Sequence, residues 1–121
     1  MKIESIKDLK VYNVSYELAM KIFELTKSFP RDEMYSLTDQ IRRSSRSVAM
    51  NIREGFAKRK YKQVYIRHLM DALGSAEETR GWIEICKDCG YISDEPRKEF
   101  DKTYDHLCAS LSRLIKSWEN F

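Results

Sequence analysis

The sequence predicts an all-α protein, folded as an antiparallel up-down-up-down four-helix bundle in which residues 1–121 form a single domain. Apolar residues recur at steps of three and four along four segments, and 42% of the residues are hydrophobic while 34% are charged. Only 4 Gly and 2 Pro occur, so few positions interrupt a helix. Such a composition is typical of a globular chain long enough to bury its own core. Short loops between long amphipathic helices favour a bundle.

The first two helices are expected at about residues 8–28 and 36–57. The first should end at Phe29-Pro30, because proline disfavours a helical conformation of the residue before it and has no amide proton. Ser36, with Asp39 three residues later, resembles a capping arrangement at the start of the second helix. The apolar positions are Leu9, Tyr12, Tyr16, Ala19, Phe23 and Thr26 in the first helix, and Leu37, Ile41, Val48 and Ile52 in the second.

The third and fourth helices are expected at about residues 62–89 and 95–119. Gly90 follows the third helix as a candidate left-handed cap, with Tyr91 and Ile92 as a hydrophobic clasp. Pro96 suits the first turn of the fourth helix. The apolar positions are Tyr65, Leu69, Ala72, Ala76, Ile83 and Cys86 in the third helix, and Phe100, Tyr104, Leu107, Leu111, Leu114 and Trp118 in the fourth.

A net charge of only +3 conceals one strongly basic segment. Residues 42–62 contain eight basic residues and one acidic residue, which gives this segment +7 and leaves −4 for the rest of the chain. At about 100° per residue, Arg42, Arg46 and Arg53 fall on one exposed line of the second helix, away from its apolar stripe. A basic cluster is the electrostatic pattern of a nucleic-acid binder, although a solvated helix face has the same pattern. The basic residues are Arg42, Arg43, Arg46, Arg53, Lys58, Arg59, Lys60 and Lys62.

The residues that most often carry chemistry are poorly placed for it. Cys86 and Cys89 lie in the last turn of a helix, where the helix dipole opposes a thiolate. Antiparallel pairing would leave His106 roughly 12 Å beyond the level of Cys86 along the bundle. His68 and His106 lack the arginine that the Arg-x(4–6)-His signature of helical-bundle nucleases requires. We therefore expect no catalytic residue, no metal site and no cofactor, with the cysteines as buried thiols.

The sequence also indicates a compartment. No apolar stretch approaches the ~20 residues of a membrane span, and the opening MKIESIKDLKVY lacks the apolar region of a secretion signal. Three cysteines, an odd number, favour reduced thiols over a disulfide framework. We expect a cytoplasmic protein that does not contact membranes.

Motifs along nearly the whole chain form a specific set, although each alone is weak. They are Asp8-Leu9-Lys10-Val11, Phe29-Pro30, LTDQIRR at 37–43, SVAMNIREG at 47–55, Gly74-Ser75 with Glu78, and Gly90-Tyr91-Ile92. This set resembles the four-helix bundle proteins encoded in 23S rRNA intervening sequences, often labelled the S23 ribosomal protein family. The resemblance implies an antiparallel four-helix bundle that assembles as a ring-like homopentamer. It also brings in a relative, the accessory variability determinant of diversity-generating retroelements, a basic pentamer that binds nucleic acid and partners a reverse transcriptase.

Six residues occupy positions of the family pattern, and a structural role is expected for them. Gly55 and Gly74 would let the second and third helices approach closely, while polar side chains would link them. The six residues are Asn51, Glu54, Gly55, Gly74, Ser75 and Glu78.

The predicted function is a non-enzymatic homo-oligomer that binds RNA or DNA weakly through phosphate contacts of the basic residues. Tyr61 and Tyr65 are candidates for stacking on exposed bases. The alternative is a protein-interaction scaffold whose basic residues serve subunit or partner contacts. A divergent helical nuclease is the third interpretation.

Overall fold

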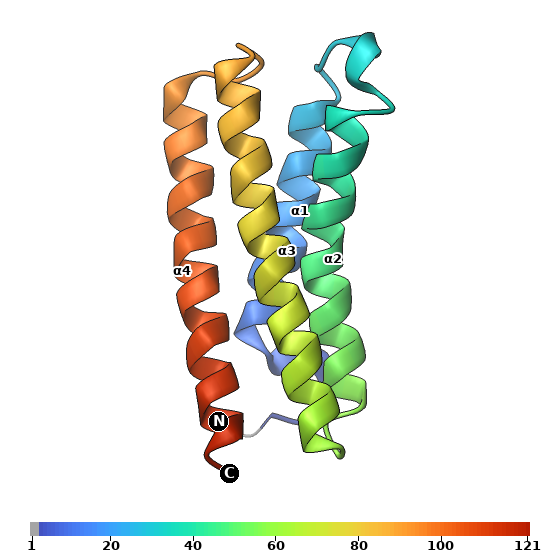
Figure 1. Cartoon of the computed structure of the whole chain (residues 1–121), viewed down its shortest axis with the longest axis vertical. Coiled ribbons are helices and arrows are strands. Elements are labelled where there is room, and N and C mark those ends of the chain that lie inside the picture. The colour runs from blue at the N-terminus through green and yellow to red at the C-terminus, as the bar shows by residue number, and fades with distance from the viewer. Residues whose placement is uncertain (1–2) are drawn as a thin grey trace.

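A computed structural model describes residues 3–121, and these residues form four α-helices and no β-strand (Figure 1). The all-α prediction is therefore confirmed. Two single turns of 3-10 helix, Ile6–Asp8 and Arg31–Glu33, precede the first and second α-helices. The four α-helices are α1 (Lys10–Thr26), α2 (Leu37–Ala57), α3 (Lys62–Asp88) and α4 (Asp94–Glu119).

Consecutive helices lie side by side (Figure 1), so that α2 contacts both α1 and α3, and α3 also contacts α4. A sparser contact between α1 and α4 completes the arrangement.

The core fills the space between the four helices with the side chains that the apolar spacing singled out. Tyr65, for example, is 1% exposed and meets the ring of Trp118 edge-on, with the ring centroids 4.7 Å apart. Tyr16 is an exception, because half of its surface is exposed although its spacing assigns it to the core stripe of α1. Phe23 of the same stripe is only half-buried and lies outside the core cluster. Fully buried side chains come from every helix and include Ile22, Ile41, Ile52, Leu69 and Leu111.

The helix ends follow local chemistry, with two corrections to the prediction. α1 ends at Thr26, earlier than the expected end at residue 28. Gly90 adopts a φ of 80°, and the amide of Tyr91 donates to the carbonyl of Cys86 at 2.9 Å, so the left-handed cap of α3 is confirmed. Ser36 occupies the predicted N-cap position of α2, but the capping hydrogen bond predicted for its side chain is absent. Its hydroxyl donates to the carboxylate of Glu33 at 2.6 Å and does not cap α2.

A close approach between α2 and α3 depends on Gly55. A Cβ atom at this position would lie 2.6 Å from the Cβ of His68 and 3.1 Å from a ring carbon of Tyr65. Such distances leave no room for a side chain. Gly74 differs, because it is exposed and a Cβ atom there would meet nothing within 4 Å. The expectation that both glycines permit the close approach is thus right for Gly55 and wrong for Gly74.

Polar side chains join α2 to α3 along the same contact. The amide oxygen of Asn51 lies 3.2 Å from Nδ1 of His68, whose Nε2 lies 3.3 Å from the carboxylate of Glu54. The hydroxyls of Ser47 and Ser75 are 2.9 Å apart. These links satisfy polar groups in a partly buried contact.

Glu78 makes no such link between helices. Its carboxylate accepts a hydrogen bond from the indole of Trp82 on the same helix, at 2.9 Å. Of the polar family-pattern residues, Asn51, Glu54 and Ser75 therefore take part in the α2–α3 contact, whereas Glu78 does not.

The two glycines supply a matched test of this packing. We expect Gly55→Ala to lower the free energy of unfolding by about 1–3 kcal/mol, because the new methyl group must displace His68 or part α2 from α3. Urea denaturation followed by circular dichroism measures the change. Gly74→Ala is the control, and it should raise stability by up to ~1 kcal/mol because alanine favours a helix more than glycine does. An equal effect of the two substitutions would contradict this account of the contact.

Candidate nucleic-acid interface

Three of the four arginines of α2 lie along its contact with α1, and we call this surface the arginine seam. They are Arg42, Arg46 and Arg53. The Nε of Arg42 donates to the hydroxyl of Thr26 at 2.8 Å, and its guanidinium carbon lies 4.9 Å from the centroid of the Phe23 ring. Arg46, one turn further, lies 5.8 Å from the same ring. A spacing of four residues places the two guanidinium groups on one side of α2, so both make cation–π contacts with the ring of Phe23.

Arg53 makes an equivalent contact nearer the other end of α2. Its guanidinium donates to the hydroxyl of Tyr12 at 2.8 Å and lies 5.6 Å from the centroid of the Tyr12 ring. The basic line that the sequence indicates is therefore present, but it rests on the aromatic side chains of α1. Arg42 is half-buried as a result, in contrast to the fully exposed line that was expected.

These three arginines keep their positive charge unpaired. Within residues 3–121, none of Arg42, Arg46 and Arg53 forms an ion pair with a carboxylate. Arg43 differs, because it lies 3.7 Å from Asp39 on an exposed surface. An aromatic ring beneath a guanidinium holds it in place without neutralising it. The seam therefore presents three oriented cations to an anion from outside.

The turn between α2 and α3 carries the other predicted basic residues, in varied roles. Arg59 lies 3.9 Å from the centroid of the Phe56 ring and donates to the carbonyl of Phe56. Lys62 reaches the backbone oxygen of Phe121 at 3.0 Å. Lys58 pairs with the carboxylate of Glu54 at 3.2 Å, whereas Lys60 is exposed and has no polar partner in the described part of the chain.

The two tyrosines predicted to stack on bases have different environments. Tyr61 is 63% exposed in the turn, so its ring can meet a ligand. Tyr65 is buried between Phe56 and Trp118, and burial raises its pKa to about 12. The prediction for Tyr65 is therefore wrong, because a core side chain cannot stack on a base.

Sequence reasoning missed a hollow in the seam. Tyr16 and Met20 of α1 and Met50 of α2 are each about half exposed around it, and its volume is about 210 Å³. The apolar residues of α1 extend over more than one side of the helix, and this excess width was the available signal. The hollow is lined by Tyr16, Ala19, Met20, Phe23, Arg46, Ala49 and Met50.

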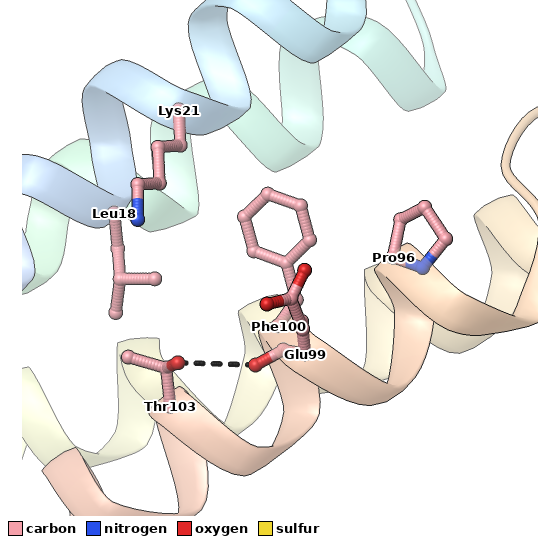
Figure 2. Close-up of a pocket in the computed structure, with 6 residues that line it drawn as sticks. All are labelled: Leu18, Lys21, Pro96, Glu99, Phe100 and Thr103. Atoms are coloured by element: carbon pink, nitrogen blue, oxygen red, sulfur yellow. Dashed lines mark hydrogen bonds between the residues drawn. The ribbon is translucent and has the colours of Figure 1, made fainter.

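A smaller cleft of about 120 Å³ lies between α1 and the first turns of α4 (Figure 2). Phe100 points from α4 toward α1, and the hydroxyl of Thr103 donates to the backbone carbonyl of Glu99 at 3.0 Å. Lys21 lies on the α1 side of the cleft. None of the predicted basic residues lines this cleft, so it is separate from the arginine seam.

The expectation of buried thiols is right for two cysteines and wrong for Cys89. Cys86 and Cys108 are buried, and burial raises the pKa of each thiol to about 12, whereas Cys89 is exposed. Within residues 3–121 no three His, Cys, Asp or Glu side chains gather closely enough to hold a metal ion. None of the described helices is long and apolar enough to cross a membrane.

Comparison with known proteins identifies relatives of the chain. The family model described as 23S rRNA-intervening sequence protein matches residues 7–113. A solved structure from Bacteroides thetaiotaomicron VPI-5482, described as a protein with unknown function from the S23 ribosomal protein family, is 29% identical. The similarity covers 92% of this chain and 99% of that one, with a TM-score of 0.81. The chain matches none of the curated proteins.

The burial of the thiols predicts their reactivity. At about pH 8, iodoacetamide should alkylate Cys89 in the native protein and leave Cys86 and Cys108 unmodified, because a buried thiol with a raised pKa is rarely a thiolate. All three should react in denaturant, as peptide mass spectrometry can determine. The Cys89→Ser variant is the control and should be inert until unfolded. Native alkylation of Cys86 as fast as that of Cys89 would contradict the buried position.

Proposed function

We propose that this chain, which belongs to the family of 23S rRNA-intervening sequence proteins, is a non-enzymatic cytoplasmic bundle that binds RNA or DNA. The proposed surface is the seam between α1 and α2, together with the turn that follows α2. One observation carries the proposal. Arg42, Arg46 and Arg53 are held against aromatic rings and have no carboxylate partner within residues 3–121.

Phosphate is the ligand chemistry that this surface suits. A guanidinium offers several N–H donors in a planar fork that matches phosphate oxygens. Arg42 and Arg53 are eleven residues apart, which separates them by roughly 16 Å along the helix. A row of this length can contact successive phosphates of one strand. Because these contacts do not depend on base identity, binding should be weak and show little sequence preference.

For assembly, we propose that the up-down-up-down bundle forms a ring-like homopentamer, as the family resemblance implies. The half-exposed Met20, Met50 and Tyr16 support association with another protein surface, because burying apolar side chains that are gathered at one hollow is favourable. Repetition of the arginine seam on every subunit would strengthen a weak contact through avidity.

The same hollow favours the second candidate function, a protein-interaction scaffold. Methionine, tyrosine and arginine are enriched at protein interfaces, and Arg46 lies beside Met50 in this hollow. On this hypothesis the arginines make subunit or partner contacts, and their removal would dissociate the assembly.

The test measures how binding to a labelled single-stranded RNA depends on salt. We expect the affinity of the native protein to fall steeply between about 50 and 200 mM salt. Replacing Arg46 and Arg53 with Gln should make the slope of log K against log salt shallower by about 1.4, because two phosphate contacts are lost. Fluorescence anisotropy gives the affinities, and light scattering gives the mass of each variant.

Lys102→Gln with Lys116→Gln is the matched control, since it removes the same charge from exposed positions of α4. The control should keep the native slope. An equal loss of slope in both variants, or native binding insensitive to salt, would overturn the proposal. Dissociation of the arginine variant, measured as a fall in mass, would favour the scaffold.

A further inference from the structure

A cavity of about 550 Å³ opens at the seam where α1 begins. Lys7 and Asn13 line it from the start of the chain and the first turn of α1, and Arg53 lines it from α2. The side-chain amide of Asn13 donates to the backbone carbonyl of Lys7 at 2.8 Å, which fixes the turn before α1. The cavity is lined by Lys7, Tyr12, Asn13, Tyr16 and Arg53.

Two tyrosines of the cavity differ in what they can offer a ligand. Tyr12 is buried, and its hydroxyl accepts the hydrogen bond from Arg53. Tyr16 is 50% exposed, and its ring centroid lies 6.0 Å from that of Tyr12 at an interplanar angle of 49°. Tyr12 therefore lies next to Tyr16 but is covered, and Tyr16 is the ring available to a ligand.

The charge of the cavity is entirely positive. Lys7 and Arg53 are its ionisable cations, and no carboxylate is among its lining residues. A guanidinium has five N–H donors, of which Arg53 gives one to Tyr12. The remaining donors stay available beside the exposed ring of Tyr16. An aromatic platform next to unpaired cations is the arrangement with which proteins hold single-stranded nucleic acid.

We propose that an unpaired nucleobase stacks on Tyr16 in this cavity while Arg53 and Lys7 hold the adjoining phosphate. The ligand class is therefore single-stranded nucleic acid. A duplex hides the faces of its bases, so it can use the arginines of the seam but not the ring of Tyr16. The inference rests on the proposed nucleic-acid binding and adds to it the strand type and a stacking residue.

The experiment separates base contacts from phosphate contacts. Its probes are a fluorescein-labelled oligouridylate of about 12 nucleotides, within the usual range of site sizes, and an abasic strand with the same backbone. Tyr16→Ala should weaken oligouridylate binding roughly 5- to 150-fold, the range that loss of one stacked base gives. The abasic strand should bind the native protein and this variant alike, and the salt slope should not change because no charge is removed.

Two further variants sharpen the test. Tyr16→Phe keeps the ring and should bind the oligouridylate like the native protein. Tyr35→Ala removes a tyrosine that is 94% exposed in the connection before α2 and outside the cavity. It should leave binding unchanged. Circular dichroism and light scattering of each variant report the fold and the mass.

The outcomes distinguish this inference from the function on which it rests. Salt-dependent native binding with Tyr16→Ala unaffected would overturn the stacking role and leave the arginine surface intact. Equal native affinity for the oligouridylate and the abasic strand would do the same. A fall in the oligomer mass of Tyr16→Ala would make Tyr16 a contact for another protein surface and overturn the proposal. An equal loss of affinity for both strands would show that Tyr16 contacts no base, and would overturn it as well. No native binding of either strand would overturn the nucleic-acid function itself.

Discussion

The close packing of α2 against α3 is the constraint on which the rest of the molecule depends. Gly55 allows His68 to approach the backbone of α2, and Ser47 and Ser75 meet across the same contact. A helix fixed along one side has its other residues fixed as well, because each position is rotated by about 100° from the last. The register of this contact therefore determines which side of α2 meets α1.

The arginine seam follows from that placement. α1 brings Tyr12 and Phe23 beneath the positions where α2 carries Arg53 and Arg42. Each guanidinium lies close to an aromatic ring and gives one hydrogen bond to a hydroxyl of α1, which leaves its other N–H donors for a ligand. A carboxylate in place of the ring would also hold the arginine, but it would cancel the charge. Aromatic support is thus compatible with a surface that binds anions, whereas ion pairing is not.

Much of the fold could be predicted from the sequence because four apolar stripes with helical spacing leave few alternatives. The candidate site was harder to predict from the sequence. Tyr65 and Tyr16 both match an apolar stripe, yet the first is buried and the second half exposed. Helical periodicity indicates which residues share a face, but only the packing of neighbouring helices determines which part of a broad apolar face is covered. The same limit applies to Gly55 and Gly74, since only the first lies opposite a side chain of the adjacent helix.

Tyr16 also connects the two hollows of the seam. It lines the apolar hollow with Met20 and Met50, and it lines the positively charged cavity with Arg53. If a second protein surface covers the methionines while a strand occupies the cavity, both ligands contact one side chain. If one ligand favours a particular orientation of that ring, its binding changes the affinity of the other ligand. The second ligand then changes the affinity of the first by the same factor, because coupling between two binding equilibria is reciprocal. On the two proposals together, assembly and nucleic-acid binding would be linked properties of one surface, and the affinity for a strand would depend on how many subunits had already associated.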